Sequence, residues 1–114
     1  MNIEYGFQAT MTAKEGKADE LVDLLLSGPT VGPSAHEGCL VFLVSRSATQ
    51  HDVVHLVEGW VSEQVHHDVF DDPESQAYIA RCAELVADSQ YTDFVPLGGK
   101  ANLDHATSRS ATGR

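Results

Sequence analysis

The chain has 114 residues, of which 42% are hydrophobic and 21% charged, and its formal net charge is −10 at pH 7. This length and composition predict one globular domain with a modest core. The acidic balance argues against binding to nucleic acid or to an anionic membrane surface. No run reaches the roughly 20 apolar residues of a membrane span, and the first residues lack the basic and apolar regions of a signal peptide. We therefore expect a cytoplasmic protein.

The first half of the chain predicts a strand, a helix and a second strand. Apolar and polar residues alternate over residues 3–13, as in a half-buried strand. Apolar residues recur at helical spacing over residues 18–25, and this helix should end near the Gly-Pro pair at 28–29. We expect a loop at 30–38 with room for a turn of helix. Residues 39–44 are apolar on both faces, which favours a central strand.

The second half predicts a third strand, two helical segments and a last strand. Residues 53–60 form an apolar run, and the polar connection before it predicts a hairpin with the preceding strand. Ser62 is suited to cap a short helix. Pro73 fits the first position of a longer helix, because its missing N–H is harmless there. The last strand is expected at 91–97.

The predicted order of elements is β-α-β-β-α-β, that of an α+β, ferredoxin-like fold with one antiparallel sheet and both helices on one face. The domain should span residues 1–100. Residues 101–114 carry no apolar period and are expected to be a flexible polar tail. Only one face of the sheet would be covered by helices, and an exposed apolar sheet marks an interface. We therefore expect a homodimer packed sheet to sheet.

No cofactor or metal site is expected. The chain has no Gly-x-Gly-x-x-Gly after a strand, no Cys-x-x-Cys and no phosphate-binding loop. Its two cysteines, Cys39 and Cys82, lie in apolar stretches, as buried free thiols do. A metal site would need three or four converging ligands, and neighbouring histidines on one helix do not converge. The candidate ligands in the sequence are His51, His55, His66, His67 and Asp68.

The end of the third strand brings a carboxylate, an indole and an imidazole to one corner. Strand alternation places Glu58 on the same face as Leu56 and Trp60. A buried carboxylate must be paired or protonated, and an imidazole with a pKa near neutrality suits a general base. His67 points about 100° away from His66 around the helix, so we favour His66. A purely structural role for Trp60 or Glu58 stays open.

Five segments together match a known family in the expected order, over nearly all of residues 3–100. They are Ala9-Thr10-Met11-Thr12-Ala13-Lys14-Glu15-Gly16-Lys17, Glu37-Gly38-Cys39-Leu40, Ser45-Arg46, Glu58-Gly59-Trp60-Val61-Ser62-Glu63 and Val95-Pro96-Leu97-Gly98-Gly99-Lys100. On these residues the chain resembles the antibiotic-biosynthesis monooxygenase (ABM) domain of the dimeric α/β-barrel superfamily. The resemblance implies a homodimer whose sheets form a barrel, with a pocket in each subunit between sheet and helices. It also implies oxygenase activity on quinol- or anthrone-like substrates without flavin, haem or metal.

The resemblance also implies site residues. Three are expected to be catalytic, namely His66, Trp60 and Glu58, and four to bind substrate, namely Leu56, Phe70, Tyr78 and Gln8. The chain departs from the family in two places. Quinone-forming members carry an asparagine four residues before the strand-end tryptophan, where this chain has Leu56. Haem-degrading relatives need a tryptophan–histidine pair in the second helical region, which here has no tryptophan.

The function expected is that of a cofactor-independent monooxygenase for a small polyphenolic or quinol-type molecule. A deprotonated phenol can activate oxygen itself, so that the protein has to orient it, accept a proton and exclude water. Two alternatives remain open. The same pocket could serve a non-catalytic small-molecule binding module or a proton-transfer (isomerase-type) enzyme.

Overall fold

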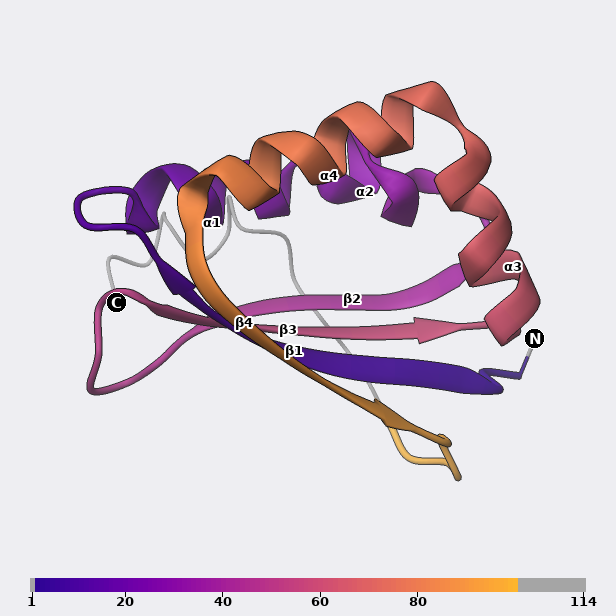
Figure 1. The fold of residues 1–114 in the computed structure, drawn as a ribbon. Coiled ribbons are helices and arrows are strands. Elements are labelled where there is room, and N and C mark those ends of the chain that lie inside the picture. The colour runs from indigo at the N-terminus through magenta and orange to yellow at the C-terminus, as the bar shows by residue number, and fades with distance from the viewer. Residues whose placement is uncertain (1, 101–114) are drawn as a thin grey trace.

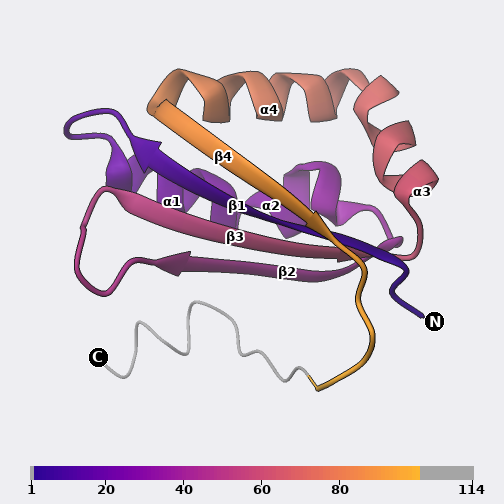
Figure 2. The ribbon, with the colours of Figure 1, turned by 60° about the horizontal axis from the view of Figure 1, so that its bottom comes forward.

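The computed structural model describes residues 2–100 as one α+β unit, in which the helices cover one face of a four-stranded antiparallel sheet (Figure 1). The elements are β1 Tyr5–Ala13, α1 Ala18–Leu26, α2 Gly28–Val31, the 3-10 turn Pro33–Ala35, β2 Cys39–Arg46, β3 Val53–Trp60, α3 Glu63–Asp68, the 3-10 turn Val69–Asp71, α4 Pro73–Leu85 and β4 Val86–Phe94. The strand order is β2-β3-β1-β4 (Figure 2). The expected ferredoxin-like arrangement is confirmed. No helix in residues 2–100 is both long and apolar enough to cross a bilayer.

Local sequence explains where the helices begin and what they bury. The side chain of Ser62 accepts a hydrogen bond from the backbone N–H of Val65 at 3.1 Å, so Ser62 caps α3 as expected. Pro73 opens α4. In α1, residues at helical spacing face the sheet and are buried, namely Ala18, Leu21, Leu24 and Leu25. The core therefore lies between the helices and the sheet.

Two expectations about the elements were wrong. β2 was expected to be central but is an edge strand, because β1 and β3 take the two central positions. One of its two apolar faces belongs to the open face of the sheet. β4 begins at Val86, directly after α4, and not at residue 91. Its first residues lack an apolar alternation, because an edge strand is held by its backbone pairing with β1. The segment 30–38 holds the end of α2 and a 3-10 turn, in agreement with the expected loop that includes a turn of helix.

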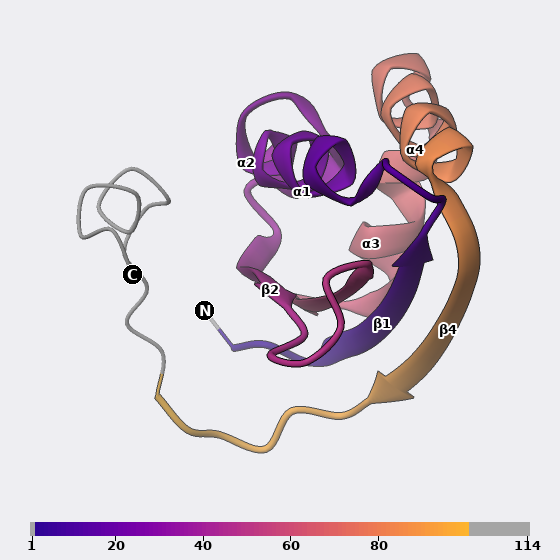
Figure 3. The same ribbon diagram turned by 90° about the vertical axis from the view of Figure 1, so that its left-hand side faces the viewer.

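The second face of the sheet has no helix over it within residues 2–100 (Figure 3). It carries apolar side chains from β2, β3 and β4, namely Val41, Leu43, Val57 and Phe94. Leu43 is 37% exposed and Phe94 36%. After β4 the chain turns across this side of the sheet, and its Leu97 is 97% exposed. This open face is the surface on which we expect a second copy of the chain to pack.

We predict that the wild-type chain is a dimer and that Leu43→Glu makes it a monomer, because a lone carboxylate buried between two sheets lacks a partner. Native mass spectrometry should give twice the chain mass of 12.3 kDa for the wild type and the single mass for the variant. Leu26→Glu is the matched control, since Leu26 is similarly exposed, at 42%, but lies on α1. A wild type that is monomeric at micromolar concentration would contradict the prediction.

Candidate functional site

The pairing of the strands aligns four inward-facing side chains in a row across the sheet. Phe42 of β2 lies opposite Glu58 of β3, Glu58 lies opposite Phe7 of β1, and Phe7 lies opposite Asp93 of β4. We call these four residues the acidic row. The next row of the same face holds Ala9 between Leu56 and Tyr91.

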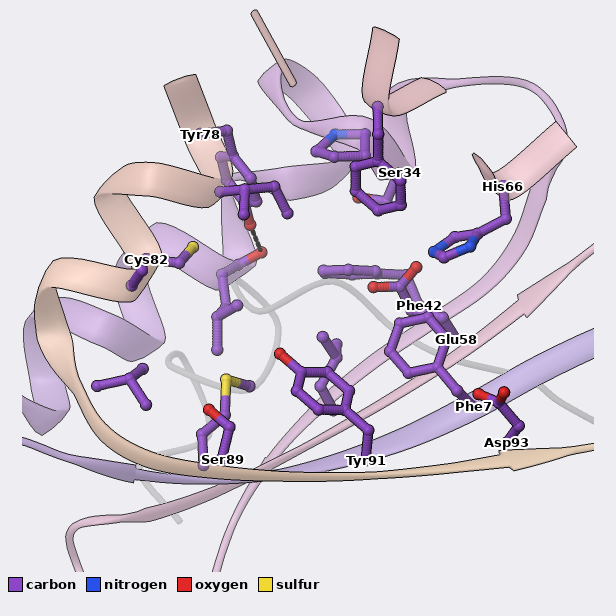
Figure 4. Close-up of a pocket in the computed structure, with 18 of the residues that line it drawn as sticks. Phe7, Ser34, Phe42, Glu58, His66, Tyr78, Cys82, Ser89, Tyr91 and Asp93 are labelled. Atoms are coloured by element: carbon purple, nitrogen blue, oxygen red, sulfur yellow. Dashed lines mark hydrogen bonds between the residues drawn. The ribbon is translucent and has the colours of Figure 1, made fainter. Parts of the chain in front are cut away.

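A cavity of about 710 Å³ lies above these rows and below the helices (Figure 4). This volume is within the range of about 300–1,000 Å³ that is usual for small-molecule sites. Its wall is mostly apolar and aromatic, with contributions from Phe7, Met11, Leu25, Phe42, Leu56, Phe70, Tyr78, Ile79, Val86 and Tyr91. In Figure 4 the side chains of Ser89, Tyr91 and Asp93 rise from β4, and His66 reaches toward Glu58 from the opposite side. The site can therefore hold an aromatic molecule next to two titratable groups.

Glu58 lines the cavity with a buried carboxyl group, only 9% exposed. The indole Nε1 of Trp60 donates a hydrogen bond of 2.7 Å to Glu58 Oε1. Burial raises the pKa of Glu58 to about 7, although the hydrogen bond from Trp60 favours the ionised form and lowers it. Glu58 can therefore take up or release a proton near neutral pH.

Trp60, one of the three residues expected to be catalytic, is not among the residues that line the cavity. Its side chain is fully buried and lies edge-on to His66, with ring centroids 5.1 Å apart. It lies behind Glu58 and His66 because it is the last residue of β3, where α3 covers the strand end. Its polar contact with the site is the hydrogen bond to the Glu58 carboxyl group. The aromatic wall consists of Tyr5, Phe7, Phe42, Phe70, Tyr78 and Tyr91.

His66 lines the cavity and is 8% exposed. Four aromatic rings surround it at centroid distances of 4.8 to 5.3 Å, those of Tyr5, Phe7, Trp60 and Phe70. Burial lowers the pKa of His66, His67 lowers it further, and Asp93 opposes the shift. The imidazole is therefore mainly neutral at neutral pH. Its Nδ1 is buried and has no hydrogen-bond partner among the described residues.

His67 points away from the cavity, as helix geometry predicts. It is exposed, and its Nε2 lies 3.7 Å from Glu63 Oε2 on the preceding turn of α3. The structure thus separates the two histidines, with His66 inside the site and His67 at the surface. The catalytic role of His66 stays a prediction.

Of the expected substrate-binding residues, Leu56, Phe70 and Tyr78 line the cavity. Gln8 does not, and its assignment to this site is wrong. It alternates with Phe7 and Ala9 along β1, so its exposed side chain lies on the open face of the sheet. The Tyr78 hydroxyl donates to the carbonyl oxygens of Leu24 and Leu25, at 3.1 and 3.2 Å, which ties α4 to α1.

Several lining residues were not predicted from the sequence. Phe7 follows from the alternation of residues 3–13, and Tyr91 and Asp93 share a face of the predicted last strand, but no local signal joins them to Glu58. Ser34 lies in the 3-10 turn before β2, where the sequence has no periodic pattern. Within residues 2–100 no group of three or more His, Cys, Asp or Glu side chains is arranged to hold a metal ion.

We predict that Glu58→Gln removes the part of the loss of unfolding free energy at rising pH that is due to ionisation of Glu58. The pKa of Glu58 in the folded protein, about 7, is above the usual value of 4.5. The contribution of Glu58 to the free energy of unfolding is therefore complete at low pH and is lost as the pH rises through 7. Relative to Glu58→Gln, the wild type should lose about 3 kcal/mol of unfolding free energy between about pH 4 and pH 8. Urea unfolding at several pH values measures this difference. Parallel curves for the two proteins would contradict it.

Comparison with known proteins agrees with this architecture. The family model described as "Antibiotic biosynthesis monooxygenase" matches residues 5–81. A crystal structure from Chloroflexus aurantiacus J-10-fl, whose name assigns it to the antibiotic biosynthesis monooxygenases, is 28% identical with a TM-score of 0.76. The match covers 85% of this chain and 96% of that one. No curated protein matches the chain.

Two more distant structures share the fold. SnoaB from Streptomyces nogalater, described as a cofactor-independent oxygenase, is 12% identical with a TM-score of 0.74, and the match covers 86% of this chain and 97% of that one. PA3566 from Pseudomonas aeruginosa is 19% identical with a TM-score of 0.70, over 86% of this chain and 98% of that one. The family model covers well over half of the sequence, and the fold is the one that the resemblance implied. The chain belongs to the antibiotic biosynthesis monooxygenase family.

Proposed function

We propose that the chain is a cofactor-independent monooxygenase that oxidises a small polyphenolic or quinol-type aromatic molecule. The observation that carries the proposal is the position of Glu58 and His66, two buried groups able to accept a proton, in the wall of an aromatic-lined cavity. Membership of the antibiotic biosynthesis monooxygenase family supports the reaction class. We further propose that the working form is a homodimer.

The proposed chemistry uses the substrate as the electron donor. A phenolic O–H placed beside the neutral imidazole of His66 or the carboxylate of Glu58 transfers its proton to that group. The resulting phenolate is electron-rich enough to react with dioxygen directly. For an anthrone, the ring CH₂ and one O₂ become a carbonyl and one water, so the atoms balance without another reductant.

The surrounding residues serve this step by position and by exclusion of water. Trp60 holds one oxygen of Glu58, which leaves the other oxygen available on the cavity side. The rings of Phe7 and Phe70 pack against His66 and limit its hydration. Desolvation strengthens each charge interaction that develops during proton transfer.

Oxygen consumption with dithranol, a hydroxylated anthrone, tests the proposal. The chain, treated with a chelator, should consume one O₂ per dithranol oxidised and form danthron, the corresponding quinone, faster than the solution reaction does. Anaerobic incubation should form none. Saturable binding of anthrones and hydroquinones with no oxygen consumption would favour the non-catalytic binding module instead.

We predict that His66→Ala lowers the turnover of such a substrate by roughly two orders of magnitude, the usual contribution of a general acid or base. The same assay measures it. His67→Ala is the matched control on the neighbouring position of α3 and should change turnover little, because His67 lies outside the cavity. Equal, small effects of both variants would show that His66 only lines the cavity.

A further inference from the structure

We infer that this cavity selects uncharged, hydroxylated polycyclic aromatic molecules and rejects the same molecules when they carry a carboxylate. The aromatic class of the ligand rests on the proposed function. The selection against acidic ligands rests on the charges and polar atoms of the cavity wall.

The formal charges on the wall are all of one sign. Three carboxyl groups line the cavity, those of Glu58, Asp88 and Asp93. Among residues 2–100 that line it there is no lysine or arginine. Arg81 of α4 lies instead in a separate surface hollow that Glu20 and Glu84 also line. An acidic group entering the cavity would therefore meet anions and no cation of the described chain.

The acidic row places two of these carboxyl groups on either side of Phe7. Glu58 and Asp93 are each one strand away from Phe7, so their backbones lie about 10 Å apart. A flat ligand that lies over the Phe7 ring is therefore close to both of them. Asp93 accepts a hydrogen bond from the Tyr5 hydroxyl at 3.1 Å but has no cationic partner within residues 2–100. Glu58 is buried, so it repels a like charge more strongly than in bulk solution, whereas Asp93 and Asp88 are exposed to water and repel a like charge more weakly.

The uncharged polar atoms of the wall suit hydroxyl and carbonyl groups. Ser34 Oγ and His66 Nδ1 are buried and have no hydrogen-bond partner among the described residues. Ser34 is 9% exposed and His66 8%, and both residues line the cavity. Buried polar atoms without a partner are rare in folded proteins and are often satisfied by a ligand or a bound water. A neutral phenolic ligand can supply such partners without adding a charge.

Three related anthraquinones test the inference by binding alone. Danthron carries two phenolic hydroxyls, rhein is danthron with one added carboxylate, and rhein methyl ester has nearly the same size as rhein without the charge. Quenching of the fluorescence of Trp60, the single tryptophan, reports their dissociation constants. At about pH 8, danthron and the ester should bind with similar affinity, and rhein at least about tenfold more weakly.

Each other outcome would overturn the inference. Weak binding of both rhein and its ester would mean that size, and not charge, excludes them. Equal binding of all three compounds would show that the cavity does not select against a carboxylate. Binding of none of them would show that hydroxylated polycyclic molecules are not its ligands. Danthron is already the oxidised quinone, so its binding can be measured whether or not the protein oxidises an anthrone. Failure of the oxygenase proposal would appear only in the dithranol assay, which keeps the two failures distinguishable.

Two matched variants separate the local charges from the overall charge of −10. Asp93→Asn keeps an oxygen that can accept the Tyr5 hydrogen bond, removes one charge from the wall, and should narrow the preference for danthron over rhein several-fold. Glu15→Gln removes the same charge from the exposed turn after β1 and should leave the preference unchanged. Equal effects of the two variants would place the selection in the overall charge and contradict a cavity-based mechanism.

Discussion

The burial of the Glu58 carboxyl group beneath the helices is the constraint on which the site depends. Alternation along β3 places Glu58 and Trp60 on the covered face, so the indole can donate to the carboxyl oxygen. The same burial raises the pKa of Glu58 to about 7 and makes a carboxyl group useful as a proton acceptor near neutrality. The Ser62 cap then starts α3 where His66 can cover the same corner.

The coverage of only one face of the sheet links the site to the expected assembly. Side chains of β3 alternate between the two faces of the sheet. Leu56 and Glu58 lie in the cavity wall, and His55 and Val57 lie on the open face. The open face carries apolar side chains that a monomer would leave in water. Packing of a second sheet there would hold β3 rigid from behind and so keep Glu58 in position for the substrate.

The cavity combines an apolar interior with acid–base groups whose charged forms are disfavoured. Burial raises the pKa of Glu58 and lowers that of His66, so both groups tend toward neutrality when the cavity is empty. In the proposed reaction, proton transfer from a phenol would create a charge pair beside these buried groups, where its attraction is stronger than in water. The predicted loss of stability at high pH follows from the same burial, and the proposed reactivity depends on it as well.

Local patterns in the sequence determined which segments form β1, β3, α1 and α4 and which residue caps α3. They also determined that the side chains of Glu58 and His66 point to the same corner. These features depend on hydrogen bonds and side-chain directions within a few residues, which the sequence displays directly. Only the tertiary structure decided that β2 is an edge strand, that Gln8 faces the open side, and that Trp60 lies behind the cavity. It also decided that Phe42, Phe7 and Asp93 join Glu58 in one row, because strand order and register arise from pairings between distant segments that no local pattern records.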